Sequence, residues 1–484
     1  MTNPTATPVP TTSPPPPATR WWGLVVIALA QLVVVLDTTI VTIALPTTQQ
    51  DLGMSDASRQ WVVTAYTLAF GGLLLLGGRI ADLVGRKKTL LVGVAGFAAA
   101  SALGGAAMNP GMLIGSRALQ GLFAALLAPS TMSLLVTMFT DHRERAKAFG
   151  IFSAVLISGG AAGLILGGVF TQYLDWRWCL YVNVPIAVAA GVGAALVLPN
   201  VPGQSGARID IAGAITGGGG MAALVFGFGQ AAASGWTSGL VLGTLAAAVV
   251  LLALFIVLQS KVRHPLLPLK VVSARNRVGA FLSVALNFIG TFGMFLFVTY
   301  QLQTVMHYSP IQAGCAFLPL MVMSAVTATQ IVARLLPKVP PRALISPGLL
   351  IAAGGMFLLT FLTPDSSYLA HILPAEILVG LGSGAVMSPS LNTATREVAP
   401  SDTGVISAFV STSQQIGASI GTALLNTIAA GTTASYLAAH ATAGQIEGNV
   451  YGYRTACGWA AGILVVAAVL AAVLINTRPQ PQRH

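Results

Sequence analysis

The sequence predicts an all-α integral membrane protein with fourteen transmembrane helices, and three observations support this fold class. Hydrophobic residues make up 55% of the 484 residues and charged residues only 8%, whereas soluble domains carry about 25% charged residues. Apolar runs of at least ~18 residues, long enough to cross a bilayer, recur along the whole chain. The basic residues gather in alternate connections between these runs. We therefore expect a protein whose main partner is the lipid bilayer.

The apolar runs divide the chain into two six-helix halves and two inserted helices. Residues 1–20 are rich in Pro, Thr and Ser and predict a disordered tail rather than a signal peptide. An N-terminal half follows at 21–198, then linker helices 7 and 8 with their loop at 199–277, a C-terminal half at 278–476 and a tail at 477–484. The expected spans are 22–45, 60–79, 89–108, 111–138, 148–171, 178–198, 209–230, 238–258, 278–303, 310–336, 343–362, 369–394, 404–430 and 452–475.

Basic residues predict the orientation of these spans. If the N-terminus is cytoplasmic, all but four of the 24 Lys and Arg lie in the tails or in even-numbered connections. The four exceptions are Arg59, Arg177, Arg454 and Arg117, and Arg117 lies inside a span. Cytoplasmic loops are enriched in Lys and Arg, so both termini are expected in the cytoplasm. The net charge of +11 is then topological, and no nucleic-acid partner is expected.

An internal repeat relates the two halves. Gly150-Ile-Phe-Ser-Ala154 recurs as Gly404-Val-Ile-Ser-Ala408, and Arg117-Ala-Leu-Gln-Gly121 aligns with Glu376-Ile-Leu-Val-Gly380. Parallel repeats of this kind build transporters whose site lies near the bilayer midplane between the halves. Chance similarity between Gly- and Ala-rich spans is the alternative.

Three ionisable residues lie deep in the predicted spans: Asp37, Arg117 and Glu376. Charged groups are costly in hydrocarbon, so such residues usually pair, line a cavity or relay protons. Arg117 and Glu376 occupy matching repeat positions, which suggests that they pair across the centre. Asp37 has hydroxyl and amide neighbours in its own helix and is therefore the better candidate to exchange protons. Static structural roles for all three are the alternative.

Two local motifs suggest moving parts. The loop from Gly78 to Lys88 has a glycine that permits a tight turn and an acid that can accept from a helix N-terminus, so we expect a conformational lock there. Its residues are Gly78, Arg79, Asp82, Gly85 and Arg86. In the fifth span, small residues predict close helix packing, and they are Gly163, Gly167 and Gly168.

A substrate cavity is expected from polar and aromatic residues on the first, second and ninth spans. The ninth span carries phenylalanines at helical spacing beside an asparagine, although such a stripe can equally face lipid or a packed core. The expected cavity residues are Gln31, Tyr66, Asn287, Phe288 and Phe292.

Enzymatic chemistry is not indicated. Gly417-Ala-Ser-Ile-Gly421 matches a nucleophile elbow, but it lies within a span and follows no strand. No lysine follows a glycine, so the chain lacks a Gly-Lys-Ser/Thr phosphate loop. The histidines form no H-x-x-x-H pair, and the three cysteines lie far apart. We expect no cofactor, no metal and no enzyme activity.

As a set, five stretches resemble the major facilitator superfamily, and specifically its fourteen-span drug:proton antiporters. The resemblance covers essentially the whole chain after residue 20. The matching stretches are Leu36-Asp-Thr-Thr-Ile-Val-Thr-Ile-Ala-Leu-Pro46, Trp61-Val-Val-Thr-Ala-Tyr66, Gly78 to Lys88, Arg117-Ala-Leu-Gln-Gly121, and Trp176-Arg-Trp178 with Asn183-Val-Pro185.

The resemblance implies export of amphipathic antibiotics or drugs, driven by inward proton flow, by a monomer in a bacterial plasma membrane. It associates Asp37 and Arg117 with proton coupling and the loop after the second span with gating. One departure weakens the antiport inference: Leu164 follows Gly163 where the family's motif has proline. A transporter of an endogenous metabolite or siderophore would have the same fold and is the alternative function.

Overall fold

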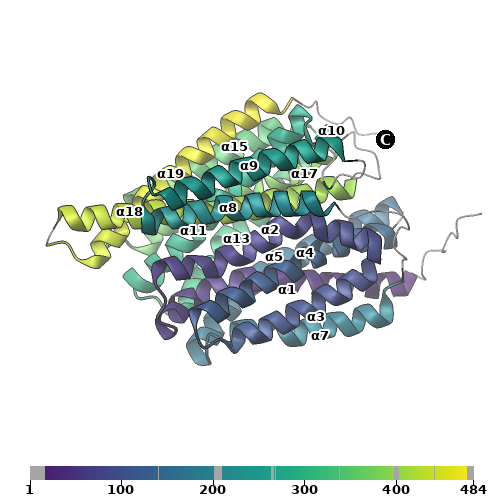
Figure 1. The fold of residues 1–484 in the computed structure, drawn as a ribbon, viewed down its shortest axis with the longest axis horizontal. Coiled ribbons are helices and arrows are strands. Elements are labelled where there is room, and N and C mark those ends of the chain that lie inside the picture. Colours follow the sequence, from purple (N-terminus) through teal and green to yellow (C-terminus); the bar gives the residue numbers. More distant parts are fainter. Residues whose placement is uncertain are drawn as a thin grey trace, which may run out of the picture.

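The computed structural model describes residues 17–139, 141–200, 210–262, 266, 269–336, 338–396, 403–440 and 442–476. The expected tails at 1–20 and 477–484 lie almost entirely outside this part of the chain. Within it the secondary structure is helical and contains no strand. Figure 1 shows the long helices running side by side, with the N-terminal half below and the C-terminal half above.

In the N-terminal half and the inserted pair, the described residues form nine helices. They are α1 (Pro17–Asp51), α2 (Asp56–Val84), α3 (Arg86–Gly105), α4 (Pro110–Met138), α5 (His142–Tyr173), α6 (Trp178–Tyr181), α7 (Asn183–Val197), α8 (Ile211–Ser234) and α9 (Gly239–Lys261). Ser55 and Asn109 begin α2 and α4 by accepting from backbone N–H groups of the first turn, which is the preferred N-cap chemistry.

The C-terminal half is more interrupted, because its helices contain prolines and π turns. It follows α10 (Leu269–Val272) and comprises α11 (Arg275–Tyr300), η1 (Gln301–Val305), α12 (Pro310–Ala316), α13 (Leu318–Val326), η2 (Thr327–Val332), α14 (Ala333–Leu335), α15 (Arg342–Leu358), η3 (Leu359–Phe361), η4 (Tyr368–Ile372), α16 (Leu373–Gly384), α17 (Met387–Thr395), α18 (Thr403–Ala439) and α19 (Gln445–Leu474).

Eleven helical segments of the described residues are long and apolar enough to cross a membrane. The expected spans at 60–79, 148–171 and 404–430 fall on α2, α5 and α18, which are not among the eleven. These three helices have 29, 32 and 37 residues, and α18 carries a polar run from Ser411 to Gln415. The all-helical membrane fold is thus confirmed, and the count of fourteen stays a prediction.

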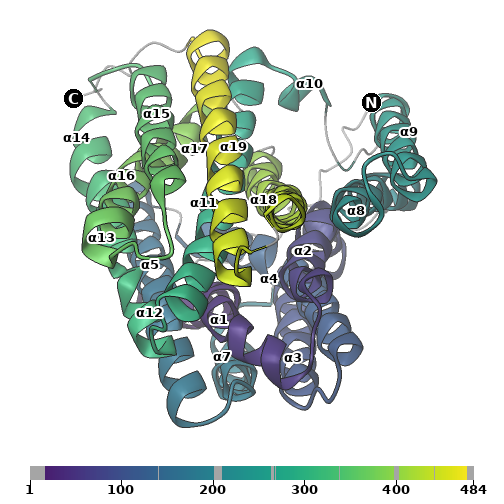
Figure 2. The ribbon, with the colours of Figure 1, turned by 90° about the vertical axis from the view of Figure 1, so that its left-hand side faces the viewer.

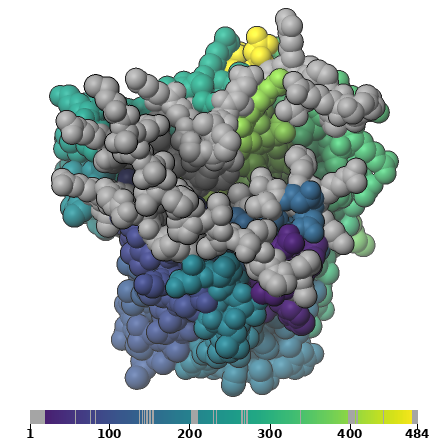
Figure 3. Space-filling view, turned by 90° about the vertical axis from the view of Figure 1, so that its right-hand side faces the viewer, coloured from purple at the N-terminus to yellow at the C-terminus, as the bar shows by residue number. Residues whose placement is uncertain are grey.

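The two halves pack their helices in the same order. In the N-terminal half, α1 contacts α5 and α7, while α4 contacts α2 and α3. In the C-terminal half, α11 contacts α18 and α19, while α16 contacts α13 and α15. The end view in Figure 2 shows the halves one above the other, with α8 beside α2 and α18, and α9 on the outer side of α8. Figure 3 views the opposite end, with the same arrangement of the two halves.

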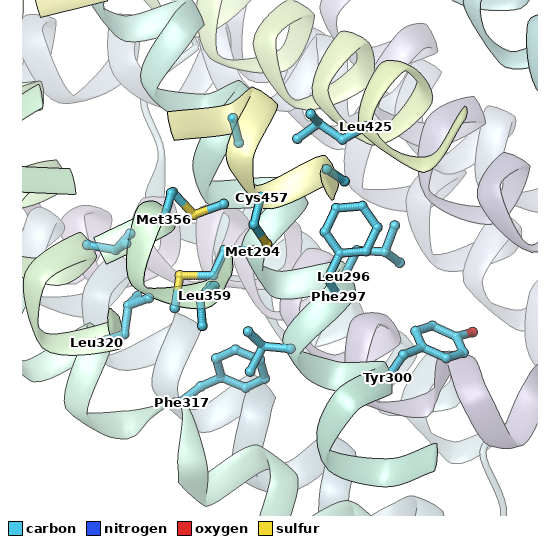
Figure 4. Packing of buried hydrophobic residues seen from close by; sticks show 14 of the residues in the cluster. Met294, Leu296, Phe297, Tyr300, Phe317, Leu320, Met356, Leu359, Leu425 and Cys457 are labelled. Atoms are coloured by element: carbon cyan, nitrogen blue, oxygen red, sulfur yellow. The ribbon is translucent and has the colours of Figure 1, made fainter. Parts of the chain in front are cut away.

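Buried apolar side chains form one cluster within the N-terminal half and a larger cluster that reaches across both halves. One cluster of buried side chains joins α1, α2, α3, α4, α5 and α7. A larger cluster joins most of the C-terminal half to parts of α1 and α5, among them Ile40 and Leu164. Part of it is drawn in Figure 4, with Met294, Phe297 and Cys457 among the members shown. Tyr300 lies at its edge, with its hydroxyl directed away from the other labelled side chains. The apolar packing of the C-terminal half is therefore continuous with that of α1 and α5.

Candidate functional site

A buried polar cluster crosses the core of the N-terminal half, centred on Asp37 and Arg117. Asp37 lies on α1 and Arg117 on α4, and they are 0% and 1% exposed. Nη1 of Arg117 donates to Oδ2 of Asp37 at 2.5 Å. The same guanidinium donates through Nε to the backbone oxygen of Val62 at 3.1 Å and lies 4.4 Å from the centre of the Tyr66 ring. Arg117 is thus fully engaged within its own half.

Two amides complete the surroundings of the Asp37 carboxylate. Nε2 of Gln120 and Nδ2 of Asn183 both donate to Oδ1, each at 2.8 Å. Gln120 also donates to the hydroxyl of Ser101 at 2.6 Å. With three donors directed at its two oxygens, Asp37 has the contacts of an ionised, acceptor-only carboxylate. Its charge is neutralised by the neighbouring guanidinium.

The expected pairing of Arg117 with Glu376 is therefore wrong, and Asp37, expected to have mainly neighbours of its own helix, takes its partners from other helices. The donors to Asp37 come from α4 and α7, which pack against α1. Removing one member of a buried ion pair costs about 3–5 kcal/mol. Arg117 therefore stays paired with Asp37 of its own half and is not available to Glu376. Matching positions in a repeat do not by themselves bring two residues together.

Glu376 lies in the first turn of α16 and has a different environment. It is 0% exposed. Its Oε2 lies 3.2 Å from the hydroxyl of Tyr368, and its Oε1 has no hydrogen-bond partner. The Tyr368 hydroxyl also lies 2.7 Å from the backbone oxygen of Ala316. The Asp37 and Glu376 carboxyl groups thus belong to two separate sites, one in each half.

The loop after α2 has the tight turn expected of it. α2 ends at Val84 and α3 begins at Arg86, and Gly85 between them has φ of 103°, a conformation that favours glycine. Lys87 fastens the loop to the end of α7 by donating to the backbone oxygens of Ala195 and Leu198 at 2.8 and 2.7 Å. Gly78 and Arg79 are half-buried in α2, and the side chain of Asp82 lies outside the described residues.

The glycines of α5 lie where that helix approaches two different neighbours. Side chains built at Gly163 and Gly167 would meet α1 at Thr39 and Ile40. A side chain at Gly168 would meet the backbone of Pro310 and Ile311 in α12 of the other half. Gly168 thus marks a point where the two halves approach closely, as small residues allow.

The five expected cavity residues divide between the halves. Tyr66 is fully buried under Arg117, and Gln31 is half-buried and accepts from Thr131 at 3.1 Å. Phe288 and Phe292 are half-buried on α11, with ring centres 5.9 Å apart. The remaining member, Asn287, is 5% exposed and accepts from Ser383 of α16 at 3.1 Å.

Polar bonds join the two halves at the end where α1 meets α2 in sequence. Arg59 donates to Oδ1 of Asn426 at 3.0 Å, and Nδ2 of Asn426 donates to Gln60 at 2.9 Å. The Arg59 guanidinium lies 4.2 Å from the centre of the Tyr300 ring, and the Tyr300 hydroxyl donates to Gln49 at 2.8 Å. We call these five residues the outer contact, because the topology expected from the basic residues places this end outside the cell.

Sequence reasoning missed Gln120, Asn183, Tyr368 and the outer contact. A signal existed for some of them. Gln120 follows Arg117 by three residues and shares its helix face, and Arg59 is an exception to the charge pattern. Tyr368 and Asn426 stand among other polar residues and carry no distinguishing pattern.

Comparisons with known proteins agree with this architecture. The family model of the Major Facilitator Superfamily matches residues 27–422. The puromycin resistance protein pur8 of Streptomyces alboniger is 52% identical over 93% of this chain and 90% of its own length. The cephamycin export protein CmcT of Amycolatopsis lactamdurans is 39% identical over 82% and 83%.

Solved structures show the same fold. A POT family transporter, PepTSo, has a TM-score of 0.70 at 14% identity and covers 95% of this chain and 98% of its own. A bacterial homologue of the lysosomal transporter Spinster, in an inward-facing conformation, has a TM-score of 0.68 over 95% and 98%. With the two-half helical fold, the family model and these relatives in agreement, the chain belongs to the Major Facilitator Superfamily, a family of membrane transporters and not of enzymes.

Proposed function

We propose that this protein exports an antibiotic or a related amphipathic compound across a bacterial plasma membrane, in exchange for protons, by alternating access. The observation that carries the proposal is the 52% identity to a puromycin resistance protein along 93% of this chain. A cephamycin export protein and a multidrug efflux pump are also similar along more than four-fifths of it.

The arrangement of the halves supports alternating access. The helices of each half pack in the same order, and polar bonds join the halves at the outer contact. Rocking of one packed unit against another exposes a central site to each side in turn. We propose that this is the conformation closed to the outside, with both termini in the cytoplasm and the monomer as the working unit.

Ionisable groups within the spans support proton coupling. Asp37, Arg117 and Glu376 are fully buried, and intramembrane ionisable residues characteristically mark ion or proton pathways. Each proton that enters releases about 2.3 kcal/mol per 100 mV of membrane potential, which can drive export against a gradient. The loop at Gly85 and the glycines of α5 are proposed as parts of the gate, and Gln31, Tyr66, Asn287, Phe288 and Phe292 as the surroundings of the substrate.

The test has two parts. Expression in a sensitive host should raise resistance to one or more of puromycin, cephamycin and tetracenomycin C. These compounds appear in the names of similar proteins. In inside-out vesicles, puromycin uptake should follow an imposed pH gradient, stop when a protonophore collapses it, and not require ATP. Vesicles lacking the protein are the control. Uptake that persists with ATP after the gradient has collapsed would contradict proton coupling. A host that gains no resistance to any of the three compounds would contradict antibiotic export.

A further inference from the structure

Glu376 lies where two interrupted helices face each other. The π turn η4 precedes α16, and Pro374 stands in the first turn of α16. On the facing side the helix is interrupted between α12 and α13, with Pro319 in the first turn of α13. Gly380 and Gly384 share a helix face with Glu376, and side chains there would meet the backbone of α13. Transporters place coupling-ion sites at such discontinuous helices.

The hydrogen bonds around Tyr368 determine where a proton can be. A phenol carries one hydrogen, and a backbone carbonyl can only accept. The Tyr368 hydroxyl is 2.7 Å from the oxygen of Ala316 and 3.2 Å from Oε2 of Glu376. If the phenol donates over the shorter distance, to Ala316, its contact with Glu376 is a hydrogen bond only when the carboxyl carries the hydrogen. The geometry therefore favours a protonated Glu376.

No charged group compensates Glu376 among the described residues. Of the elements packed against α16, α13, η2 and α17 carry no titratable side chain. On η4 the titratable residues are Tyr368 and the half-buried His371, whose Nδ1 lies 3.3 Å from the backbone oxygen of Ser367. The ring of Tyr308 lies 6.4 Å from that of Tyr368. The arginines of α11 and α15 have partners elsewhere: Arg275 donates to Val473, Arg277 to Ala394 and Arg396, and Arg342 to Asn476. Tyr300 on α11 donates to Gln49. An ionised carboxylate without a nearby cation would carry a large desolvation free energy here. Asp37 differs, because the guanidinium of Arg117 lies beside it.

We propose that Glu376 and Tyr368 form the proton-carrying site of the C-terminal half, loaded in this conformation, while Asp37 stays ionised as the counterion of Arg117. This rests on the proposed proton-driven function and assigns its carrier. On release, the carboxyl O–H bond breaks and the proton passes to water. The phenol then turns its hydrogen from Ala316 to the new carboxylate, so that charge and atoms balance.

This exchange of hydrogen bonds connects the proton to the gate. Losing the bond to Ala316 detaches η4 from α12. α12 is the helix that α5 approaches at Gly168, and a side chain at Gly314 of α12 would meet the backbone of Leu164. Loss of the proton therefore loosens a helix that forms part of the contact between the halves. Protonation of one carboxyl is in this way linked to the closure of the outer end.

Infrared spectroscopy of the purified full-length protein in lipid nanodiscs, without drug, tests the protonation directly. We expect a C=O stretching band of a protonated carboxylic acid at neutral pH that is absent in Glu376→Gln. The band should move in Tyr368→Phe, which removes its hydrogen-bond partner, and persist at a shifted position in Glu376→Asp. Glu447→Gln, at an exposed glutamate of the outer hairpin, is the matched control and should keep the band. An unchanged band in Glu376→Gln would overturn the proposal.

Transport in proteoliposomes tests the role of the site, with puromycin as the probe. Glu376→Gln should reduce gradient-driven puromycin accumulation to that of empty liposomes while puromycin exchange without a gradient continues. Accumulation equal to wild type in Glu376→Gln would refute the carrier role and leave the proposed function standing. If the wild type itself shows no gradient-driven movement, the proposed function fails, and the infrared band still decides whether Glu376 holds a proton.

Discussion

Removing the side chain of Asn426 should open the outer contact. Asn426 lies on α18 and is 3% exposed. It accepts from Arg59 at 3.0 Å and donates to Gln60 at 2.9 Å, so one amide joins α18 to two residues of α2. Asn426→Ala removes both bonds at once and leaves the two partners buried without them. In a conformation that is open to the outside, water satisfies the same groups, so the substitution penalises only the closed form.

The expected size follows from the two bonds. A hydrogen bond to a charged group contributes about 1.5–3 kcal/mol and a neutral one about 0.5–1.5 kcal/mol. Their joint loss should raise the free energy of the closed form by about 2–4 kcal/mol relative to the open form. Since 1.4 kcal/mol is a factor of ten in an equilibrium constant, the open-to-closed ratio should rise by about 30- to 700-fold.

Distance measurements between spin labels can detect this shift. Labels at Gln50 of α1 and Ala438 of α18, both exposed, report the separation of the outer ends after the exposed Cys315 is replaced by Ser. Asn426→Ala should populate a longer distance that is minor in the parent. Asn449→Ala is the control, because Asn449 accepts from Gln445 within its own helix. An unchanged distance distribution in Asn426→Ala would refute the reasoning.

Three further predictions concern the other parts of the machinery. Asp37→Asn should lower the free energy of unfolding by about 3–5 kcal/mol by leaving Arg117 charged and unpaired. Adding Arg117→Gln should recover much of that loss. Thermal unfolding in detergent measures the stability of both variants, and losses that simply add would contradict the pairing. Gly168→Leu should hold the halves apart at α12 and abolish transport without lowering the unfolding temperature, whereas normal transport would exclude a close approach there. Asp82→Asn should slow turnover with unchanged puromycin affinity, and normal turnover at equal expression would remove Asp82 from the gate.

The helices were predictable because membrane spans follow from local composition. Each long helix of the structure overlaps an expected span, and Gly85 has the backbone conformation that its loop required. The burial of Asp37, Arg117 and Glu376 was also predictable, since ionisable residues in apolar runs have few alternatives. Such properties depend on a residue and its immediate neighbours in sequence.

The partners of those residues were not predictable, because they depend on contacts between segments that lie far apart in the sequence. Asp37 contacts Arg117 80 positions away and Asn183 146 positions away, and no local pattern indicates which of the buried groups pair with one another. The repeat aligned Arg117 with Glu376, but a repeat fixes equivalent places in two halves and not the distance between them. The Tyr368 contact depends on an interrupted helix, whose geometry is decided by tertiary packing.

The position of α8 gives the protein two unlike sides. α8 contacts α2 of one half and α18 of the other, and Thr427 donates to the backbone oxygen of Phe228 at 2.8 Å; Figure 2 shows it beside both helices. On the opposite side, the described helices packed against α5 and α12 all belong to the two halves. A compound dissolved in the bilayer thus meets a covered boundary at α2 and α18 and an uncovered one at α5 and α12. For the proposed export of amphipathic compounds, lateral entry from the lipid leaflet is therefore expected at α5 and α12, and photoreactive lipid-soluble drugs should label that side selectively.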